Sequence, residues 1–479
     1  MPSSHALHPY EPMLKESAQH FLSELQKRHP DLSGMSSIFA RLIQTLHDPP
    51  LEIVWFHSAV TYRCRVSFAE ETFAGVSAVN DLFRLLVSCS ASCCGVKRIA
   101  VLAPVILKLS ELANREICSW SRTEIDRFVE GAVSYICICC CRGLENNRGL
   151  TPSTLCFSDS VLVWTVDPSV EEWDFRESLK AFYPLVGNGA LQRIGVGCEV
   201  GYLAGAVMVE ALMLRLCLKL GCGGSTVELH EDMVNWAVNS INMFRSWYFL
   251  DIMFRTLLDT NFPVTSLWDL GNEILARRVL YDAIITVDYS FLDPRNGSIQ
   301  ITLDDLKELA LSWLFVAEEA VQFMRRHGDQ SKAIAYADAF HGSWLCCQLV
   351  EWVCSQTGMV DKNIQTVAST PSGLIRLILI LDFQKVGSFG HYISKLHNRV
   401  VAYRSKVMDE LGISNPESKK VDAIEMLSRT GVRRKREGDL IEGEIQAKFV
   451  RCHFEGMLMG DGPLSPCNAD EENMEAMEV

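Results

Sequence analysis

The chain has 479 residues, of which 48% are hydrophobic, and its 59 acidic and 45 basic residues give a formal net charge of −14. This composition is typical of a folded protein with a large core, and it excludes a globally disordered chain, a collagen, a coiled coil and a small disulfide scaffold. An acidic chain lacks the basic face that general nucleic-acid binding requires, so we expect no direct contact with nucleic acid. The length predicts either two to four domains or one elongated repeat array.

The apolar segments are too short or too charged to span a membrane. The longest run without Asp, Glu, Lys or Arg covers residues 363–375 and is polar, whereas a spanning helix needs about 20 mostly apolar residues. The most apolar stretch, Val200–Leu218, contains Glu210 and Arg215, so we expect a buried core helix there and no membrane partner. Met1–Tyr10 has no features of a secretory signal, and the 18 cysteines then predict a reducing compartment, cytosol or nucleus.

Helical periodicity dominates the sequence and predicts an all-α fold. Helix starts are expected near residues 12, 32, 51, 76, 96 and 122. Thr302 can cap a helix through the amide of Asp305, and Ser121 can do the same with Glu124. The clearest apolar stripe follows Thr302 at steps of three and four. It consists of Leu306, Leu309, Ala310, Trp313, Leu314, Ala317, Ala320, Val321 and Met324.

Shorter patterns add detail to this fold. A second stripe contains Met35, Ile38, Phe39, Leu42, Ile43 and Leu46, and a later one contains Phe389, Ile393, Leu396, Val400 and Val407. Val161–Val166 is rich in β-branched residues and Ser298–Thr302 alternates, so each is a candidate short strand. Neither belongs to a βαβ alternation, and no parallel sheet is expected.

The expected helix starts recur every 20 to 26 residues, so that a pair of helices takes about 40 to 47 residues. In this rhythm the chain resembles armadillo and HEAT α-helical repeat proteins over roughly the first 410 residues. The resemblance implies an irregular α-solenoid, and a non-repeating multi-helix domain gives a similar rhythm. No consensus residue recurs at a fixed offset, so no binding residue is carried over from those families.

Breaks in the helical pattern suggest the domain organisation. Residues 1–412 are predicted to form one α-helical domain, with an internal break near residues 142–159. Residues 413–479 form a charged C-terminal segment, and its last ten residues carry five acidic and no basic side chains. A flexible C-terminal tail is expected from this composition.

The strongest short motif is a pair of basic clusters within the C-terminal segment. Twelve residues separate the two clusters, a spacing that resembles a bipartite nuclear import signal. The candidate signal consists of Lys419, Lys420, Arg433, Arg434, Lys435 and Arg436. It predicts a nuclear import carrier as one partner and the nucleus as the location, with a share in the cytoplasm left open; a solvated basic surface is the alternative.

Cysteine and glycine motifs have structural explanations. Cys137 and Cys140 have the spacing of one zinc ligand pair, but they lie in an apolar helical stripe without a second pair, so a core position is favoured. Gly197, Gly201 and Gly205 fall every four residues. They favour close approach of a neighbouring helix over a phosphate-binding loop.

The acidic and histidine motifs are equally limited. Asp304, Asp305 and Glu308 resemble one acidic motif of all-α terpenoid synthases, although a helix N-terminus attracts acids through its dipole in any case. His230 lacks metal partners at helical spacing, and His341 is expected in the core or at an interface.

No nucleophile, phosphate loop or metal motif emerges, so no catalytic residue, cofactor or metal is predicted. The sequence favours a non-enzymatic scaffold or adaptor that binds other proteins, acting in a nuclear complex whose process (transcription, chromatin, recombination or repair) is left open. The alternative is an all-α metal-dependent enzyme whose ligands converge from distant helices.

Overall fold

A computed structural model describes residues 10–25, 27, 36–66, 74–114, 119–141, 156–165, 174–195, 199–221, 227–259, 270–296, 301–357 and 369–384. All regular secondary structure in these ranges is helical, which confirms the predicted all-α class. The stripe from Phe389 to Val407, the predicted boundary near residue 412 and the C-terminal tail lie outside the described residues.

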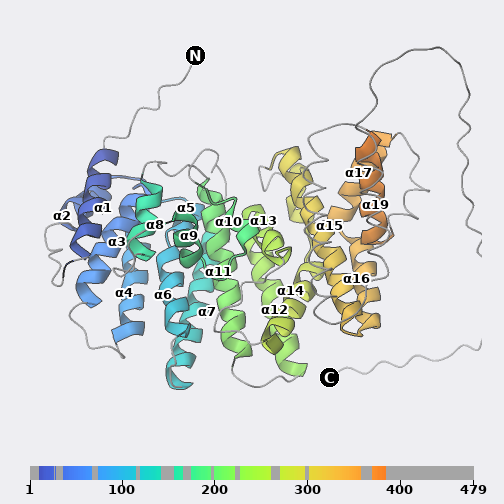
Figure 1. The fold of residues 1–479 in the computed structure, drawn as a ribbon, viewed down its shortest axis with the longest axis horizontal. Coiled ribbons are helices and arrows are strands. Elements are labelled where there is room, and N and C mark those ends of the chain that lie inside the picture. The colour runs from blue at the N-terminus through green and yellow to red at the C-terminus, as the bar shows by residue number, and fades with distance from the viewer. Residues whose placement is uncertain are drawn as a thin grey trace, which may run out of the picture. The chain divides into compact units, whose positions relative to one another are not determined.

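Figure 1 labels the helices in chain order. They are α1 (Glu11–Leu25), α2 (Ser36–Thr45), α3 (Leu51–Val66), α4 (Ala74–Cys89), α5 (Gly95–Ala100), α6 (Ala103–Asn114), α7 (Ser119–Cys141), α8 (Phe157–Thr165), α9 (Phe175–Phe182), α10 (Asn188–Leu191), α11 (Val200–Leu220), α12 (Val227–Phe244), α13 (Trp247–Leu257), α14 (Leu270–Thr286), α15 (Leu303–Arg326), α16 (Gln330–Gly342), α17 (Trp344–Thr357) and α19 (Pro371–Gln384). Two 3-10 turns, η1 (Ser290–Leu292) and η2 (Pro294–Asn296), precede α15.

Many neighbours in the chain are also neighbours in space. α2 packs on α3, α3 on α4, and α15 on both α16 and α17. Other contacts skip several helices, because α8 packs on α1 and α3, and α11 packs on α5. A regular solenoid restricts contacts to adjacent repeats. The described residues therefore establish an all-helical fold, and no regular repeat is identified among them.

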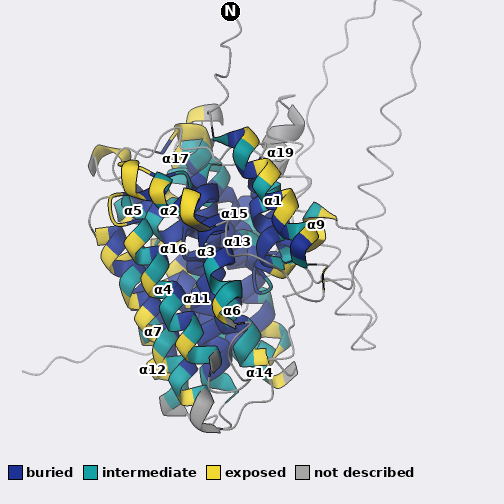
Figure 2. Ribbon diagram, turned by 90° about the vertical axis from the view of Figure 1, so that its left-hand side faces the viewer, coloured by how far each residue is buried: buried dark blue, intermediate teal, exposed yellow. Residues whose placement is uncertain are grey.

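Helix α11 is the apolar stretch that the sequence placed in the core, and that prediction is confirmed. It packs on α5, α6, α7, α13 and α14, and its residues from Leu203 to Leu218 are all buried. Figure 2 shows the dark blue of buried residues over α11 and α13. Both charged interruptions have partners. Glu210 accepts hydrogen bonds from the Leu185 amide at 2.8 and 3.0 Å, and Arg215 lies 3.0 Å from Glu130.

Helix α15 begins where the sequence predicts. The Thr302 hydroxyl accepts a hydrogen bond from the Asp305 amide at 3.1 Å, so the predicted N-cap is confirmed. Every residue of the predicted stripe is buried. Burial extends well beyond that stripe, to Phe315 and Glu319 among others, because α15 packs against α13, α14, α16, α17 and α19.

Two local predictions are wrong, and a third falls largely outside the described residues. Residues 161–165 of the predicted strand belong to α8, where Val161 and Trp164 are buried and the Trp164 indole donates to the Trp55 carbonyl at 3.2 Å. Tertiary packing thus overrides the β-branched composition. Of the second candidate strand, residues 298–300 lie outside the described residues, and the rest leads into the cap of α15. Helix α7 begins at Ser119, so Ser121 lies inside it rather than at its cap.

The predicted stripe of α2 is only partly buried. Phe39 and Ile43 are in the core, whereas Ile38 and Leu46 have exposed fractions of 53% and 38%. His341, expected in the core or at an interface, is exposed near the end of α16. In both cases periodicity identified the helix, while the number of neighbouring helices decided how much of its surface is buried.

Candidate functional site

The residues of the candidate import signal, from Lys419 to Arg436, lie outside the described residues. Their role stays a prediction. The acidic motif at the start of α15 lies within the described residues, and it belongs to the main polar network near this helix end.

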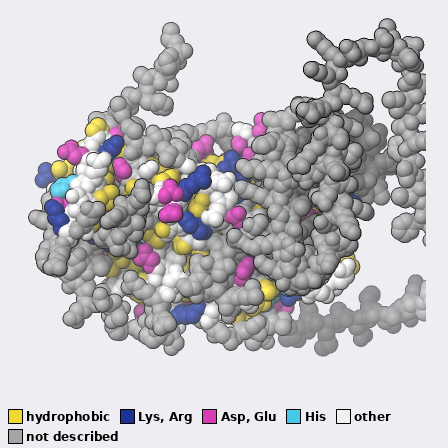
Figure 3. Space-filling model, in the orientation of Figure 1, with side chains coloured by type: hydrophobic (Ala, Val, Ile, Leu, Met, Phe, Trp, Pro, Cys, Tyr) yellow, Lys and Arg dark blue, Asp and Glu magenta, His cyan; other side chains and the backbone are white. Residues whose placement is uncertain are grey.

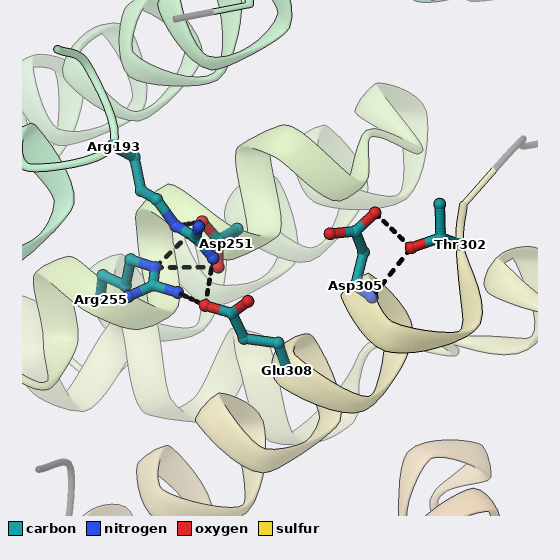
Figure 4. A network of polar contacts seen from close by, with 6 residues as sticks. All are labelled: Arg193, Asp251, Arg255, Thr302, Asp305 and Glu308. Atoms are coloured by element: carbon teal, nitrogen blue, oxygen red, sulfur yellow. Dashed lines mark hydrogen bonds and ion pairs between the residues drawn. The ribbon is translucent and has the colours of Figure 1, made fainter. Parts of the chain in front are cut away.

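The three acids of this motif have different surroundings. The Asp304 side chain is 88% exposed and lies 3.7 Å from Lys307. Asp305 is tied to Thr302 by the capping hydrogen bonds. Glu308, one turn further along α15, turns toward α13 and forms ion pairs with Arg193 and Arg255 (Figure 4). The motif therefore does not converge on one point.

Glu308 belongs to a network that joins three parts of the chain. Arg193 follows α10, Asp251 and Arg255 lie four residues apart on α13, and Glu308 lies on α15. The Arg255 Nε donates to both carboxylate oxygens of Asp251 at 2.9 and 3.0 Å, and the Arg193 Nε lies 3.4 Å from Asp251. The network is charge-balanced, because two guanidinium groups face two carboxylates.

The electrostatics of this network favour an ionised Glu308 held by arginine. Burial alone would raise the pKa of Glu308, but hydrogen bonds and charges from Arg193 and Arg255 lower it below its ordinary value. A metal site would instead need several donors that converge on one cation. Among the described residues, no group of three His, Cys, Asp or Glu side chains is placed to hold a metal ion.

Three partly exposed aromatic side chains lie beside the network, and we call Tyr202, Trp247 and Tyr248 the aromatic surface. The Tyr202 ring meets Trp247 and Tyr248 edge-on at centroid distances of 5.7 and 5.2 Å, and Trp247 stacks on Tyr248 at 4.1 Å. The Tyr248 hydroxyl donates to Glu199 at 2.6 Å. Arg193 lies over the Tyr202 ring at 5.6 Å, which joins the aromatic surface to the ion-pair network.

Glycines in α11 make room for this surface, as the sequence predicted. A Cβ on Gly201 would overlap the Tyr248 ring, and one on Gly205 would lie 2.7 Å from the Tyr248 carbonyl oxygen. Helix α13 starts after a short turn in which Arg245 has a φ of 42° and the Ser246 hydroxyl accepts from the Phe249 amide at 3.4 Å. The steric interpretation of Gly201 and Gly205 is thus confirmed, while Gly197 lies outside the described residues.

A second polar cluster surrounds Asp282 of α14. Its carboxylate oxygens lie 3.1 Å from His230 Nε2, 2.8 Å from Lys332 Nζ and 2.7 Å from the Tyr336 hydroxyl. Burial would raise the pKa of Asp282, but these hydrogen bonds lower it. The cluster links α12, α14 and α16, and its geometry is that of an interhelical clamp.

Cys137 and Cys140 are buried within α7, as predicted for core cysteines. Burial raises the pKa of the Cys137 thiol to about 11 and that of Cys140 further. Both side chains are therefore neutral thiols at physiological pH, which suits a packing role rather than nucleophilic chemistry.

Sequence reasoning found Glu308 but missed its partners. Asp251 and Arg255 have a four-residue spacing that favours an ion pair within a helix, and this signal was available. Arg193 and the Asp282 cluster carry no local signal, because their partners lie 50 or more residues away.

On the face seen in Figure 3, acidic, basic and hydrophobic side chains of the described residues are interspersed. Within the described part of the chain, no helix combines the length and the apolar character needed to cross a membrane. Comparison with family models, curated proteins and solved structures found no match to this chain.

Proposed function

We propose that this protein is a non-enzymatic interaction scaffold or adaptor that binds other proteins within a nuclear complex. The observation that carries the proposal is the aromatic surface, in which three partly exposed rings lie side by side at the starts of α11 and α13. Tyrosine and tryptophan are enriched in protein interfaces, because each combines a large apolar area with a polar end.

An exposed leucine lies at the start of α15, close in the chain to an acid whose charge reaches the rings. Leu303 is 66% exposed and lies two residues before Asp305, whose charge acts on both Tyr202 and Tyr248. The alternative of a metal-dependent enzyme receives less support from the same region. Glu308 is held there by two arginines, and Asp304 extends into solvent beside Lys307.

The scaffold proposal is tested by placing a charge on the surface without disturbing the core. In tagged full-length protein, Leu303→Asp introduces an acid at the first position of α15, where the helix dipole tolerates it. Ile334→Asp on α16 is the matched control, since Ile334 is 54% exposed. Ile334 comes after the C-terminal end of α15, whereas Leu303 is at its N-terminal end. The 24 residues of α15, at a rise of about 1.5 Å each, make this helix roughly 36 Å long, so the control position lies away from the aromatic surface.

We expect a reproducible set of proteins to co-purify with the wild type and with Ile334→Asp, and to be lost with Leu303→Asp. The most abundant partner is then purified and mixed with each variant, and the mass of the complex is measured by size-exclusion chromatography with light scattering. Equal binding by both variants would contradict a role for this surface. The absence of any complex from purified components would contradict the scaffold function itself.

The nuclear part of the proposal rests on the basic clusters. Changing Arg433, Lys435 and Arg436 together to Ala is expected to move a fluorescently tagged chain from the nucleus to the cytoplasm. An unchanged distribution would identify these residues as a solvated basic surface.

A further inference from the structure

One face of the aromatic surface already holds a cation from the protein itself. The Arg193 guanidinium lies over the Tyr202 ring, 5.6 Å from its centroid, within the range of a cation–π contact. The electron-rich faces of aromatic rings attract cations, and arginine adds an aliphatic stem that packs on apolar surface. The chemistry of the rings therefore suits a second basic side chain supplied by a partner.

Two carboxylates lie near the rings. Glu199, at the start of α11, accepts the Tyr248 hydroxyl hydrogen bond and makes no capping bond to its own helix. Asp305 comes from α15, and its charge, together with burial as the larger cause, raises the pKa of both Tyr202 and Tyr248. The two acids approach the surface from different helices.

Two carboxylates near the rings lie outside the ion-pair network. Arg193 and Arg255 are matched by Asp251 and Glu308 in the ion-pair network. Glu199 and Asp305 then remain as carboxylates without an arginine partner among the described ion pairs, and each favours a basic group of a partner over an acidic one.

We infer that the aromatic surface binds a basic segment of a partner protein, with an arginine or lysine side chain lying over the rings near Glu199 and Asp305. This inference rests on the proposed scaffold function and specifies the chemistry of its partner. Arginine fits best, because its planar guanidinium can stack on a ring while donating to carboxylates at its edge.

The test measures binding of short fluorescent peptides to the purified full-length protein by fluorescence anisotropy. One peptide alternates glycine with arginine, and two others carry glutamine or glutamate in place of arginine. Glu199→Gln and Asp305→Asn each remove one negative charge with little change of shape. Asp338→Asn is the control, because Asp338 is an exposed acid on α16 and the net charge of −14 attracts basic peptides everywhere.

We expect the arginine peptide to bind more tightly than the glutamine peptide, and the glutamate peptide not to bind. Each of Glu199→Gln and Asp305→Asn should raise the Kd of the arginine peptide about fivefold, equivalent to about 1 kcal/mol. Asp338→Asn should leave the Kd within about twofold of the wild type. Thermal denaturation of each variant checks that the fold is intact.

Equal weakening by Asp338→Asn, equal binding of the arginine and glutamine peptides, or preferential binding of the glutamate peptide would each overturn the inference. The scaffold function is tested separately from the basic partner. One result separates the two proposals: a partner is lost with Leu303→Asp but binds Glu199→Gln and Asp305→Asn like the wild type. The proposed scaffold function then stands, and the basic partner is refuted.

Discussion

Replacing Gly205 by alanine measures how closely α13 approaches α11. A Cβ at this position would lie 2.7 Å from the carbonyl oxygen and 2.8 Å from the carbonyl carbon of Tyr248. Both are backbone atoms, so no side-chain rotation can relieve the overlap. The start of α13 must move away by about 0.7 Å to reach the 3.4 Å at which ordinary contact begins.

Two opposing effects set the magnitude. Overpacking in a close-packed core costs about 1–3 kcal/mol. Alanine is better than glycine inside a helix by about 1 kcal/mol, which offsets part of that cost. We therefore expect Gly205→Ala to lower the free energy of unfolding by about 0–2 kcal/mol.

Gly131→Ala is the matched control, since Gly131 is exposed within α7 and a Cβ there meets nothing within 4 Å. Only the helix-propensity effect applies, and this variant should be more stable than the wild type by about 0.5–1 kcal/mol. Urea denaturation followed by circular dichroism at the helical band compares the two variants. Equal midpoints for Gly131→Ala and Gly205→Ala would refute the close approach of α13 to α11.

Three further predictions concern acidic side chains that are buried or partly buried. Asp282→Asn should destabilise the protein by about 2 kcal/mol at neutral pH, because it weakens the polar contacts that join α12, α14 and α16. The pKa of Asp282 is lowered in the folded protein, so its stabilising effect is lost when the carboxylate is protonated. The difference in stability between this variant and the wild type, measured by urea denaturation, should therefore shrink as the pH falls below about 4. Burial raises the pKa of Glu210 to about 8, so ionisation of this side chain opposes folding. The free energy of unfolding of the wild type should therefore decline between about pH 5 and pH 8. Glu210→Gln should flatten that decline, and a pH profile equal to that of the wild type would contradict this role of Glu210. Glu308→Gln should lower the free energy of unfolding by about 1–2 kcal/mol, because two arginines lose their shared carboxylate. Asp304→Asn, at the 88% exposed neighbouring acid, should change it by no more than about 0.5 kcal/mol. Equal thermal denaturation curves for the two variants would argue against a stabilising network at Glu308.

Local sequence patterns were sufficient for much of the fold. The cap at Thr302 and the stripe that follows it predicted α15, because capping and helical periodicity act within one or two turns of the chain. The same applies to the apolar stretch of α11 and to the spacing of Gly201 and Gly205. Residues 161–165 show the limit, since their β-branched composition suggested a strand and packing within the core made them helical.

What the sequence determined by itself is the all-helical class, the position of the central helix α11 and the presence of acids at the start of α15. Only the tertiary structure decided that Glu308 meets Arg193, which is 115 residues away, and that Asp282 meets Lys332 from another helix. Helical periodicity specifies which face of a helix is apolar but carries no information about which helix covers that face. The choice of partner comes from packing between distant segments, and that choice placed the aromatic surface beside a charge-balanced network.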